Sequence, residues 1–282
     1  MKIHQSLVQT SAPIATTHET TTATATADAP ALARQQLAPS YQRQGSGPIK
    51  VAFFDADSTL RVSLSGSVSA NGPRDVALLP NVGATLKRLV DEGYLIAIVS
   101  NQSGVEFGHV SLEDADRALQ YTAELVRQAG GDVHWVDFAE AKGDRRKPDI
   151  GMARDLETFL VEKFGKDATI DKDASIMVGD SAYKKGEPRP DGGVGKDFSN
   201  SDRLFAEKLG VAFREPVDFF GWRALGVDGF ENIAALDAFR ARREADARDL
   251  VGSTPRTTTT TSLQPARSSA LQVRIAALQK DG

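Results

Sequence analysis

Short, continuous apolar runs alternate with longer amphipathic segments through the middle of the chain. The apolar runs predict strands, which cover residues 51–54, 94–101, 133–138, 175–180 and 211–214. The segments between them have helical spacing and predict helices over residues 79–93, 111–131, 150–165 and 201–210. Strands that are apolar along their whole length indicate a parallel sheet covered on both faces. We therefore expect an α/β fold, a Rossmann-like doubly wound parallel sheet with helices on both faces.

The segment 61–76, RVSLSGSVSANGPRDV, interrupts this alternation soon after the first strand. It is rich in Gly and Ser and has alternating Val and Leu, which predicts a small β-hairpin flap. No domain-sized insertion follows it, and none lies between Gly104 and Lys147. We therefore expect no large cap domain, and a site at the end of the sheet that a macromolecular end could reach.

Thr-rich stretches flank the alternating region. Residues 1–48 contain THETTTATATADAPA and few bulky side chains, and residues 253–282 begin with STPRTTTTTS, so both are predicted to be disordered tails. The folded domain is predicted over 49–222, followed by a C-terminal helical appendage over 223–252 with its helix near 231–251. We expect the tails to be solvated spacers or arms that bind an unknown protein partner, with a short helix in LQVRIAALQ.

Composition narrows the possible functions. The chain has 282 residues, of which 40% are hydrophobic, enough for one sizeable α/β domain. The net charge of −4 argues against strong non-specific binding to nucleic acid, although a local basic groove stays compatible with it. The absence of cysteine excludes disulfides, thiolate zinc sites and a cysteine nucleophile. No apolar run is long enough to span a bilayer and no secretory signal is present, so we expect a cytoplasmic protein without membrane association.

Polar side chains stand where the predicted strands end, which is where ligands bind in parallel sheets. Each group alone is compatible with an ordinary turn. Together they supply a nucleophile, an acid/base, hydroxyl and amide donors, a fixed cation and a distal carboxylate, the groups that metal-assisted phosphoryl transfer requires. The groups are Asp55-Ala56-Asp57-Ser58-Thr59, Ser100-Asn101-Gln102, Lys147-Pro148 and Gly179-Asp180.

In this order, the motifs DxDxT, SN, KP and GD resemble those of the phosphatase branch of the haloacid dehalogenase superfamily, over about residues 49–222. Longer phrases resemble the polynucleotide 3′-phosphatase family more narrowly. They are SNQSG (100–104), KPDIGM (147–152), GKDFSNSDRLFAEKLGVAF (195–213) and EPVDFF (215–220). Two features depart from the family: Ser58 replaces the usual glycine of DxDGT, and no kinase half is present, because VGKD at 194–197 is not a Walker A loop.

The resemblance implies a Mg²⁺-dependent phosphomonoester hydrolase that forms an aspartyl-phosphate. Asp55 would attack phosphorus, and Asp57 would protonate the leaving alkoxide and then deprotonate the hydrolytic water. Lys147 would neutralise charge on the phosphoryl group and on Asp55.

For substrate binding, the resemblance implies that Ser100 and Asn101 donate hydrogen bonds to the phosphoryl group. Thr59 would orient Asp57 or its loop, the alternative being a plain turn threonine. Arg146 is expected to contact substrate, and its neighbour Arg145 is expected in a solvated loop.

For the metal, Asp55, the backbone carbonyl of Asp57, and Asp180 are the expected Mg²⁺ ligands. The superfamily often has a second acid four residues after the position of Asp180, but Lys184 stands there in this chain. Asp197 is the predicted substitute, the alternative being a loop residue that leads into the next helix.

Three functions remain open. The leading hypothesis is a phosphatase acting on a DNA 3′-phosphate end, with a role in DNA repair. The loop 183–197, whose basic residues are Lys184, Lys185, Arg189 and Lys196, would be either a rail for backbone phosphates or a solvated loop. A small-metabolite phosphatase of the histidinol-phosphate or heptose-bisphosphate (sugar-phosphate) type is the nearest alternative, although such relatives often have a cysteine-rich zinc loop. The third is a catalytically dead interaction module of the same fold.

Overall fold

The computed structural model of the protein describes residues 34–252, with side chains up to residue 248. The predicted tails therefore fall outside the described residues over 1–33 and 253–282, and so does the helix predicted in LQVRIAALQ. In the part of the chain that is described, no helix is both long and apolar enough to cross a membrane.

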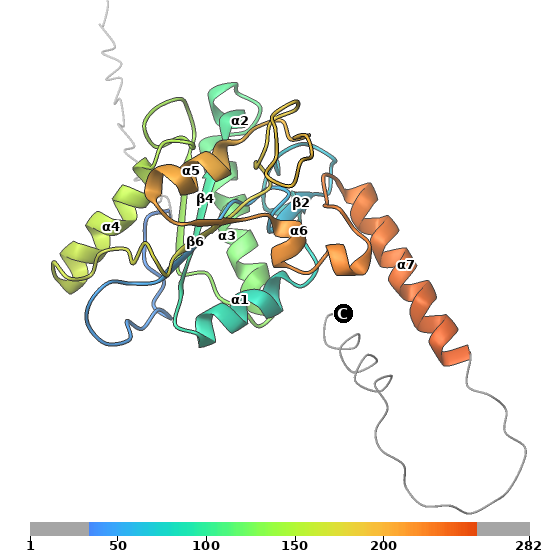
Figure 1. The fold of residues 1–282 in the computed structure, drawn as a ribbon, viewed down its shortest axis with the longest axis horizontal. Coiled ribbons are helices and arrows are strands. Elements are labelled where there is room, and N and C mark those ends of the chain that lie inside the picture. Colours follow the sequence, from blue (N-terminus) through green and yellow to red (C-terminus); the bar gives the residue numbers. More distant parts are fainter. Residues whose placement is uncertain (1–33, 253–282) are drawn as a thin grey trace, which may run out of the picture. The chain divides into compact units, whose positions relative to one another are not determined.

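The described core is built on a parallel sheet of five strands in the order β5-β4-β1-β6-β7 (Figure 1). Because β1 is the central strand, its carboxyl end lies in the middle of the sheet edge. Every one of its residues is buried. The predicted α/β fold is confirmed. The strands are β1 (Val51–Phe54), β4 (Leu95–Asn101), β5 (Trp135–Ala139), β6 (Ile176–Val178) and β7 (Ala212–Arg214).

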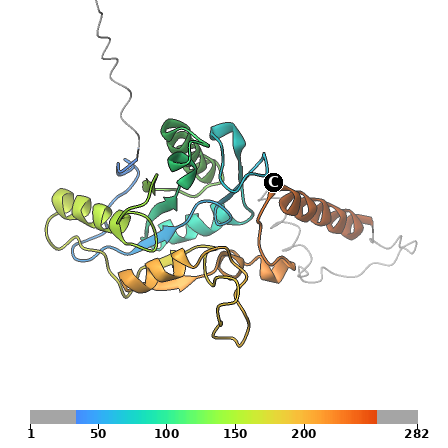
Figure 2. The ribbon, with the colours of Figure 1, turned by 90° about the horizontal axis from the view of Figure 1, so that it is seen from above.

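Helices cover both faces of this sheet, and Figure 2 shows the green α3 and the orange α5 on opposite sides of the blue β1. Alternate residues of β1 enter two separate clusters: Ala52 and Phe54 pack with α1 and α3, and Val51 and Phe53 with α4 and α5. This alternation explains why the strand is apolar throughout. The helices are α1 (Val82–Asp91), α2 (Ser103–Glu106), α3 (Leu112–Gln128), α4 (Gly151–Phe164) and α5 (Ser201–Leu209).

The predicted flap is present as the antiparallel pair of β2 (Arg61–Ser63) and β3 (Val76–Leu78). A 3-10 turn, η1 (Pro73–Asp75), precedes β3. The carboxylate of Asp75 fastens the loop between the strands, because it accepts hydrogen bonds from the backbone N–H groups of Ser65 (2.6 Å) and Asn71 (2.9 Å).

Residues 34–48 form an ordered strap, so the predicted boundary of the disordered tail at residue 48 is wrong for this segment. The backbone N–H of Gln35 donates to the carbonyl of Val136 (2.9 Å), on the edge strand β5. Leu37 and Tyr41 pack against the core cluster of α4 and α5. The strap therefore hydrogen-bonds to backbone groups of the edge strand and covers apolar surface. A solvated tail would do neither.

The chain beyond residue 222 also contributes to the core, so the predicted domain end is too early. Phe230, Leu236 and Phe239 are buried in the same cluster as Trp222. Trp222 is anchored in turn, because its indole N–H donates to the carbonyl of Pro80 (2.8 Å). The predicted C-terminal helix is present as α7 (Ile233–Gly252), after α6 (Pro216–Phe219) and η2 (Arg223–Leu225).

The strap predicts a stability effect that a disordered tail would not have. The ring of Tyr41 lies 5.2 Å from that of His134 and 6.2 Å from that of Phe164. Tyr41→Ala is expected to lower the free energy of unfolding by about 1–2 kcal/mol, since the ring is partly buried. Urea unfolding measures the change, with Gln42→Ala, an exposed neighbour, as the control. Equal stability of the two variants would contradict the strap.

Candidate active site at the carboxyl edge of the sheet

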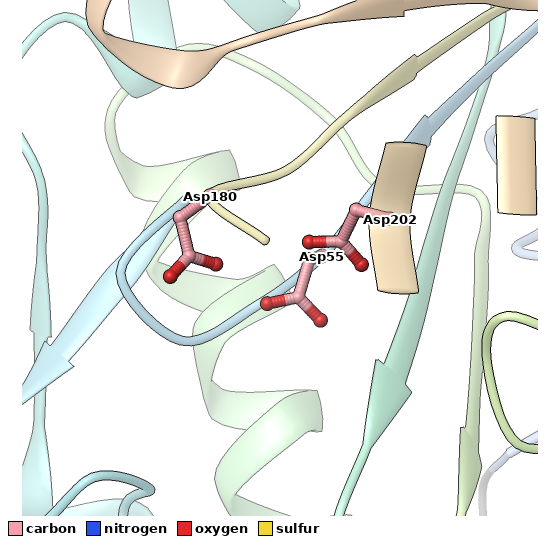
Figure 3. A group of neighbouring side chains, drawn as sticks. All are labelled: Asp55, Asp180 and Asp202. Atoms are coloured by element: carbon pink, nitrogen blue, oxygen red, sulfur yellow. The ribbon is translucent and has the colours of Figure 1, made fainter. Parts of the chain in front are cut away.

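Three aspartates from separate parts of the chain meet at the carboxyl end of β1 (Figure 3). Asp55 directly follows β1, Asp180 follows β6, and Asp202 lies in the first turn of α5. Each offers a carboxylate oxygen, and these oxygens lie within 4.8 Å of one another. Because β1 and β6 are parallel neighbours, their ends lie side by side, and α5 adds the third carboxylate from the other side.

Lys147 supplies the cation in this group. Its ammonium nitrogen lies 2.7 Å from Asp55 Oδ1 and 2.7 Å from Asp202 Oδ1, and its side chain is buried. If all three carboxyl groups are ionised, they exceed the single ammonium by two negative charges. A divalent cation would balance that excess, and carboxylate oxygens are the ligands that Mg²⁺ prefers.

The pKa values reflect the crowding of charge. Burial raises the pKa of Asp55 to about 6; Lys147 opposes this effect, while Asp202 and Asp57 add to it. Burial, together with the charges of Asp55 and Asp202, raises the pKa of Asp180 well above its ordinary value. Burial works against the charge of Lys147, yet Asp202 and Asp55 together raise the pKa of its ammonium group. Without a metal ion, keeping these carboxyl groups ionised therefore costs free energy.

Asn101 positions Lys147 through the backbone. Its side-chain amide donates to the carbonyl of Lys147 (2.9 Å) and its Oδ1 accepts from the N–H of Lys147 (2.9 Å). The peptide bond between Lys147 and Pro148 is cis. The resemblance implies that Asn101 donates to the phosphoryl group, and in the structure one N–H of its side-chain amide is used by the loop that carries Lys147.

Asp57 lies under the flap, and its side chain is only 14% exposed. Its carboxylate accepts from Arg61 Nε (2.9 Å) on one side and from Gln102 Nε2 (2.9 Å) on the other. Gln102 also donates to the buried hydroxyl oxygen of Ser100 (2.9 Å), which leaves the Ser100 proton free to be donated elsewhere. Gln102 is part of the phrase SNQSG, but the phrase alone indicates no role for it.

The loop after Asp55 explains the glycine that the related signature usually has. Ser58 has φ of 59°, in the left-handed region that favours glycine. The adjacent Thr59 is fully buried, and its hydroxyl makes no hydrogen bond with a described residue. The structure therefore shows no bond by which Thr59 would orient Asp57.

Asp202 occupies the place that the sequence predicts for Asp197. The carboxylate of Asp197 instead accepts from the backbone N–H groups of Ala182 (3.0 Å) and Tyr183 (2.8 Å), so it holds the loop and stays outside the three-aspartate group. The alternative of a loop residue thus describes Asp197 better. The sequence does contain a signal for Asp202, because it stands in the first turn of the predicted helix 201–210.

Gly179, of the GD motif, makes room for Asp202. A Cβ atom on residue 179 would lie 2.2 Å from Asp202 Oδ2, a distance at which something must shift. The same oxygen accepts from the backbone N–H of Ser181 (3.1 Å). The glycine therefore lets the third carboxylate approach the end of β6.

The two arginines before Lys147 differ in their contacts. Arg145 forms ion pairs with the buried Asp137 and with Asp155 (3.0 Å), so it is not the solvated loop residue that the sequence suggests. Arg146 is half-buried and donates to the hydroxyl of Ser103 (3.2 Å), at the start of α2. It remains the better candidate for contact with substrate.

The loop 183–197 joins Asp180 to the segment that carries Asp202, so it borders the site. Lys184, Lys185 and Lys196 are exposed. Arg189 instead forms an ion pair with Glu215, so its charge is already paired within the protein and it fits the predicted phosphate rail less well. Phe198 directly follows the loop and is fully exposed. The rim of the site thus combines cationic side chains with an exposed aromatic ring.

The sequence of this chain is similar to those of known proteins. The family described as "Polynucleotide kinase 3 phosphatase" matches residues 50–220. An uncharacterised 20.8 kDa protein of Autographa californica nuclear polyhedrosis virus, from the FGF-VUBI intergenic region, is 35% identical over 62% of this chain and 87% of its own length.

Two curated relatives have named activities. The bifunctional polynucleotide phosphatase/kinase of Schizosaccharomyces pombe is 29% identical over 65% of this chain, which spans only 40% of that protein. A D-glycero-beta-D-manno-heptose-1,7-bisphosphate 7-phosphatase of Haemophilus ducreyi is 31% identical over 46% of this chain and 72% of its own length. The chain therefore belongs to the polynucleotide kinase 3 phosphatase family, and it is a phosphatase of the haloacid dehalogenase superfamily, a phosphoric monoester hydrolase.

Proposed function

We propose that the protein is a Mg²⁺-dependent phosphatase that works through an aspartyl-phosphate on Asp55 and acts on polynucleotide 3′-phosphate ends. The observation that carries the chemistry is the contact of Lys147 with Asp55 and Asp202 inside a group of three carboxylates. This arrangement puts a nucleophile beside a fixed cation and leaves negative charge for a metal ion to balance.

The residues present fit Mg²⁺. Asp55, Asp180 and Asp202 would hold it with hard oxygen ligands, and the two excess negative charges match its charge. When bound, the ion would draw charge from the phosphoryl oxygens and so ease attack by an anionic nucleophile. Asp57, predicted as a ligand through its carbonyl, keeps its carboxylate for proton transfer.

The protein residues divide the reaction between them. A carboxylate oxygen of Asp55 forms a bond to phosphorus as the bond from phosphorus to the leaving oxygen breaks, and Asp57 gives that oxygen a proton. Water then attacks phosphorus while Asp57 takes a proton back, the bond between phosphorus and the Asp55 oxygen breaks, and inorganic phosphate leaves. Lys147 and the hydroxyl of Ser100 stabilise the phosphoryl charge throughout.

A polynucleotide end is supported by the family match and by the rim of the site. Exposed lysines can contact backbone phosphates, and an exposed aromatic ring such as Phe198 can stack on a base. The described flap is a pair of three-residue strands, much smaller than a cap domain, and this favours a substrate as large as a chain end.

A sugar-phosphate substrate is the second candidate, and its support is the heptose-bisphosphate phosphatase relative. The hypothesis of a catalytically dead module has less support, because Asp55, Asp180 and Asp202 lie together, Lys147 contacts Asp55, and Asp57 is held by Arg61, as the proposed chemistry requires.

Asp55→Asn is expected to abolish turnover of para-nitrophenyl phosphate in a folded protein, because the amide has nearly the same shape but is a poor nucleophile. Activity of the wild type is expected to require Mg²⁺ and to vanish in EDTA. Steady-state assays and circular dichroism check both statements. Substantial hydrolysis by the variant, or full activity in EDTA, would refute the mechanism.

Metal-free protein is expected to lose stability as pH rises. The pKa of Asp55 is about 6 when folded against 3.8 for an ordinary carboxyl group, so the folded state binds more protons between these values. Stability therefore falls from about pH 4 to about pH 6, and the raised pKa of Asp180 extends the fall to higher pH. Mg²⁺ should raise the melting temperature more at neutral pH than at pH about 5, where protons compete for the carboxylates.

Thermal unfolding in EDTA and in Mg²⁺ measures this effect. Asp180→Asn is the matched control, because it removes one carboxylate of the crowded group. In this variant the fall with pH should be shallower and the Mg²⁺ shift should be small. A pH dependence identical to that of the wild type would show that the charge crowding does not limit stability.

Hydrolysis of a DNA 3′-phosphate is expected to depend on salt through the rim lysines. The double substitution Lys184→Ala and Lys185→Ala should lower kcat/KM on a 3′-phosphate oligonucleotide and reduce its salt dependence, because backbone contacts are electrostatic. The same variant should hydrolyse para-nitrophenyl phosphate normally, since neither lysine contacts the reacting group.

The control is Lys166→Ala with Lys172→Ala, two exposed lysines in the segment that leads into the amino end of β6, which removes the same net charge. If the control weakens DNA hydrolysis equally, or if DNA is a poorer substrate than the small ester, the polynucleotide assignment fails. A heptose bisphosphate assayed beside the oligonucleotide then tests the second candidate.

A further inference from the structure

Arg61 is a buried arginine beside the proposed acid/base, and the sequence pattern indicates no role for it. It is the first residue of β2, and its side chain is fully buried. Nε lies 2.9 Å and Nη2 3.4 Å from the two carboxylate oxygens of Asp57. The third nitrogen, Nη1, donates to the hydroxyl of Thr122 on α3 (3.0 Å), which itself donates to the carbonyl of Ala118 (2.8 Å).

This contact fixes both oxygens of the carboxylate. A single hydrogen bond would let the Asp57 carboxylate rotate, whereas the planar guanidinium contacts both oxygens at once. Gln102 Nε2 also donates to Oδ2 (2.9 Å), so hydrogen bonds from two residues fix the carboxylate. A fully buried guanidinium is costly unless it is paired, and among the described residues its ion pair is with Asp57.

The loop geometry ties the pair to the nucleophile. The backbone N–H of Arg61 donates to the carbonyl of Ala56 (3.1 Å), and the carbonyl of Arg61 accepts from the N–H of Ser58 (2.8 Å). Arg61 and Asp57 are therefore parts of one tight turn that begins directly after Asp55. Thr122 anchors the far end of the guanidinium to a helix of the core, so the position of Asp57 is set by the fold as well as by the loop.

We propose that Arg61 is a positioning residue that holds Asp57 for proton transfer to the leaving oxygen. The proposal rests on the proposed function, in which Asp57 is the acid/base. When Asp57 gives its proton to the leaving oxygen, it becomes a carboxylate, and the guanidinium stabilises that anion without exchanging a proton itself. The water attack then returns a proton to Asp57.

The proposal predicts a dependence on the leaving group that a structural role would not produce. Phenyl phosphate and para-nitrophenyl phosphate carry the same ring, but phenolate is the more basic leaving group and needs protonation more. Loss of the acid should therefore slow phenyl phosphate far more. Attack by Asp55 and stabilisation by Lys147 serve both esters alike, so damage to those residues should lower both rates together.

The experiment compares kcat/KM on both esters for wild type, Arg61→Met, Arg61→Lys and Asp57→Asn. Arg61→Met keeps an apolar stem and removes the charge; it should lose about a hundredfold on phenyl phosphate and less than about tenfold on para-nitrophenyl phosphate. Arg61→Lys, which restores the charge without the planar contact, should lie between Arg61→Met and wild type. Arg145→Met is the matched control, because its ion pair with Asp137 supports the Lys147 loop, and it should lower both rates by one factor.

The double variant Arg61→Met with Asp57→Asn decides whether Arg61 acts through Asp57. If it does, adding Arg61→Met to Asp57→Asn should cause no further preference between the esters. Equal losses on both esters for Arg61→Met, or additive losses in the double variant, would overturn the proposal. Circular dichroism confirms folding, and Arg61→Lys supplies the answer if Arg61→Met does not fold. Failure of the proposed function is distinguishable, since it would appear as turnover by Asp55→Asn.

Discussion

The ammonium group of Lys147 is buried 2.7 Å from carboxylates of both Asp55 and Asp202, and the other polar contacts of the site are arranged around it. Without this cation, three carboxylates would lie close together in a buried region, where the free-energy cost of an unpaired charge is high. With it, burial still raises the pKa values of Asp55 and Asp180, and the neighbouring carboxylates add to this effect. In the proposed function, a divalent cation would balance this remaining negative charge.

Contacts outside the carboxylate group keep its members in place. Asn101 holds the backbone of Lys147 with two hydrogen bonds, and Gly179 leaves space for Asp202 against the end of β6. Arg61 does the same for Asp57. In each case a residue that does not belong to the three-carboxylate group determines where a charged side chain of the candidate site lies, which is how a site keeps its geometry in the absence of substrate.

The short flap connects the proposed chemistry to the choice of substrate. A hydrolase of small esters gains from enclosing its substrate, whereas a phosphatase of chain ends must admit a polymer. In the described residues, the flap is short, the bordering loop presents lysines, and Phe198 is fully exposed. These features favour a polynucleotide end, and the same phosphoryl chemistry would serve a sugar phosphate.

The sequence by itself determined the elements, the sheet and most of the charged residues of the site. Apolar runs and helical spacing are local properties, and strand ends in a parallel sheet meet at one edge, so the order of residues is enough to place Asp55, Lys147 and Asp180 together. Asp57 is identified in the same way. The ordered structure of residues 34–48 could not be predicted from the sequence. The segment has few large apolar residues, and its order depends on packing of Leu37 and Tyr41 against the core and on hydrogen bonds to the edge strand β5.

The hydrogen-bond and ion-pair partners of the polar residues are known from the tertiary structure and could not be predicted from the sequence. Asp197 and Asp202 stand in one phrase, and spacing cannot tell a carboxylate that binds backbone N–H groups from one that faces Lys147. Likewise, the side chain of Asn101 hydrogen-bonds to the backbone of Lys147, and the buried side chain of Arg61 contacts Asp57 and Thr122. Hydrogen bonds and ion pairs join residues far apart in the chain and depend on directions within a few ångströms, which the packing of helices on the sheet sets and the order of residues does not.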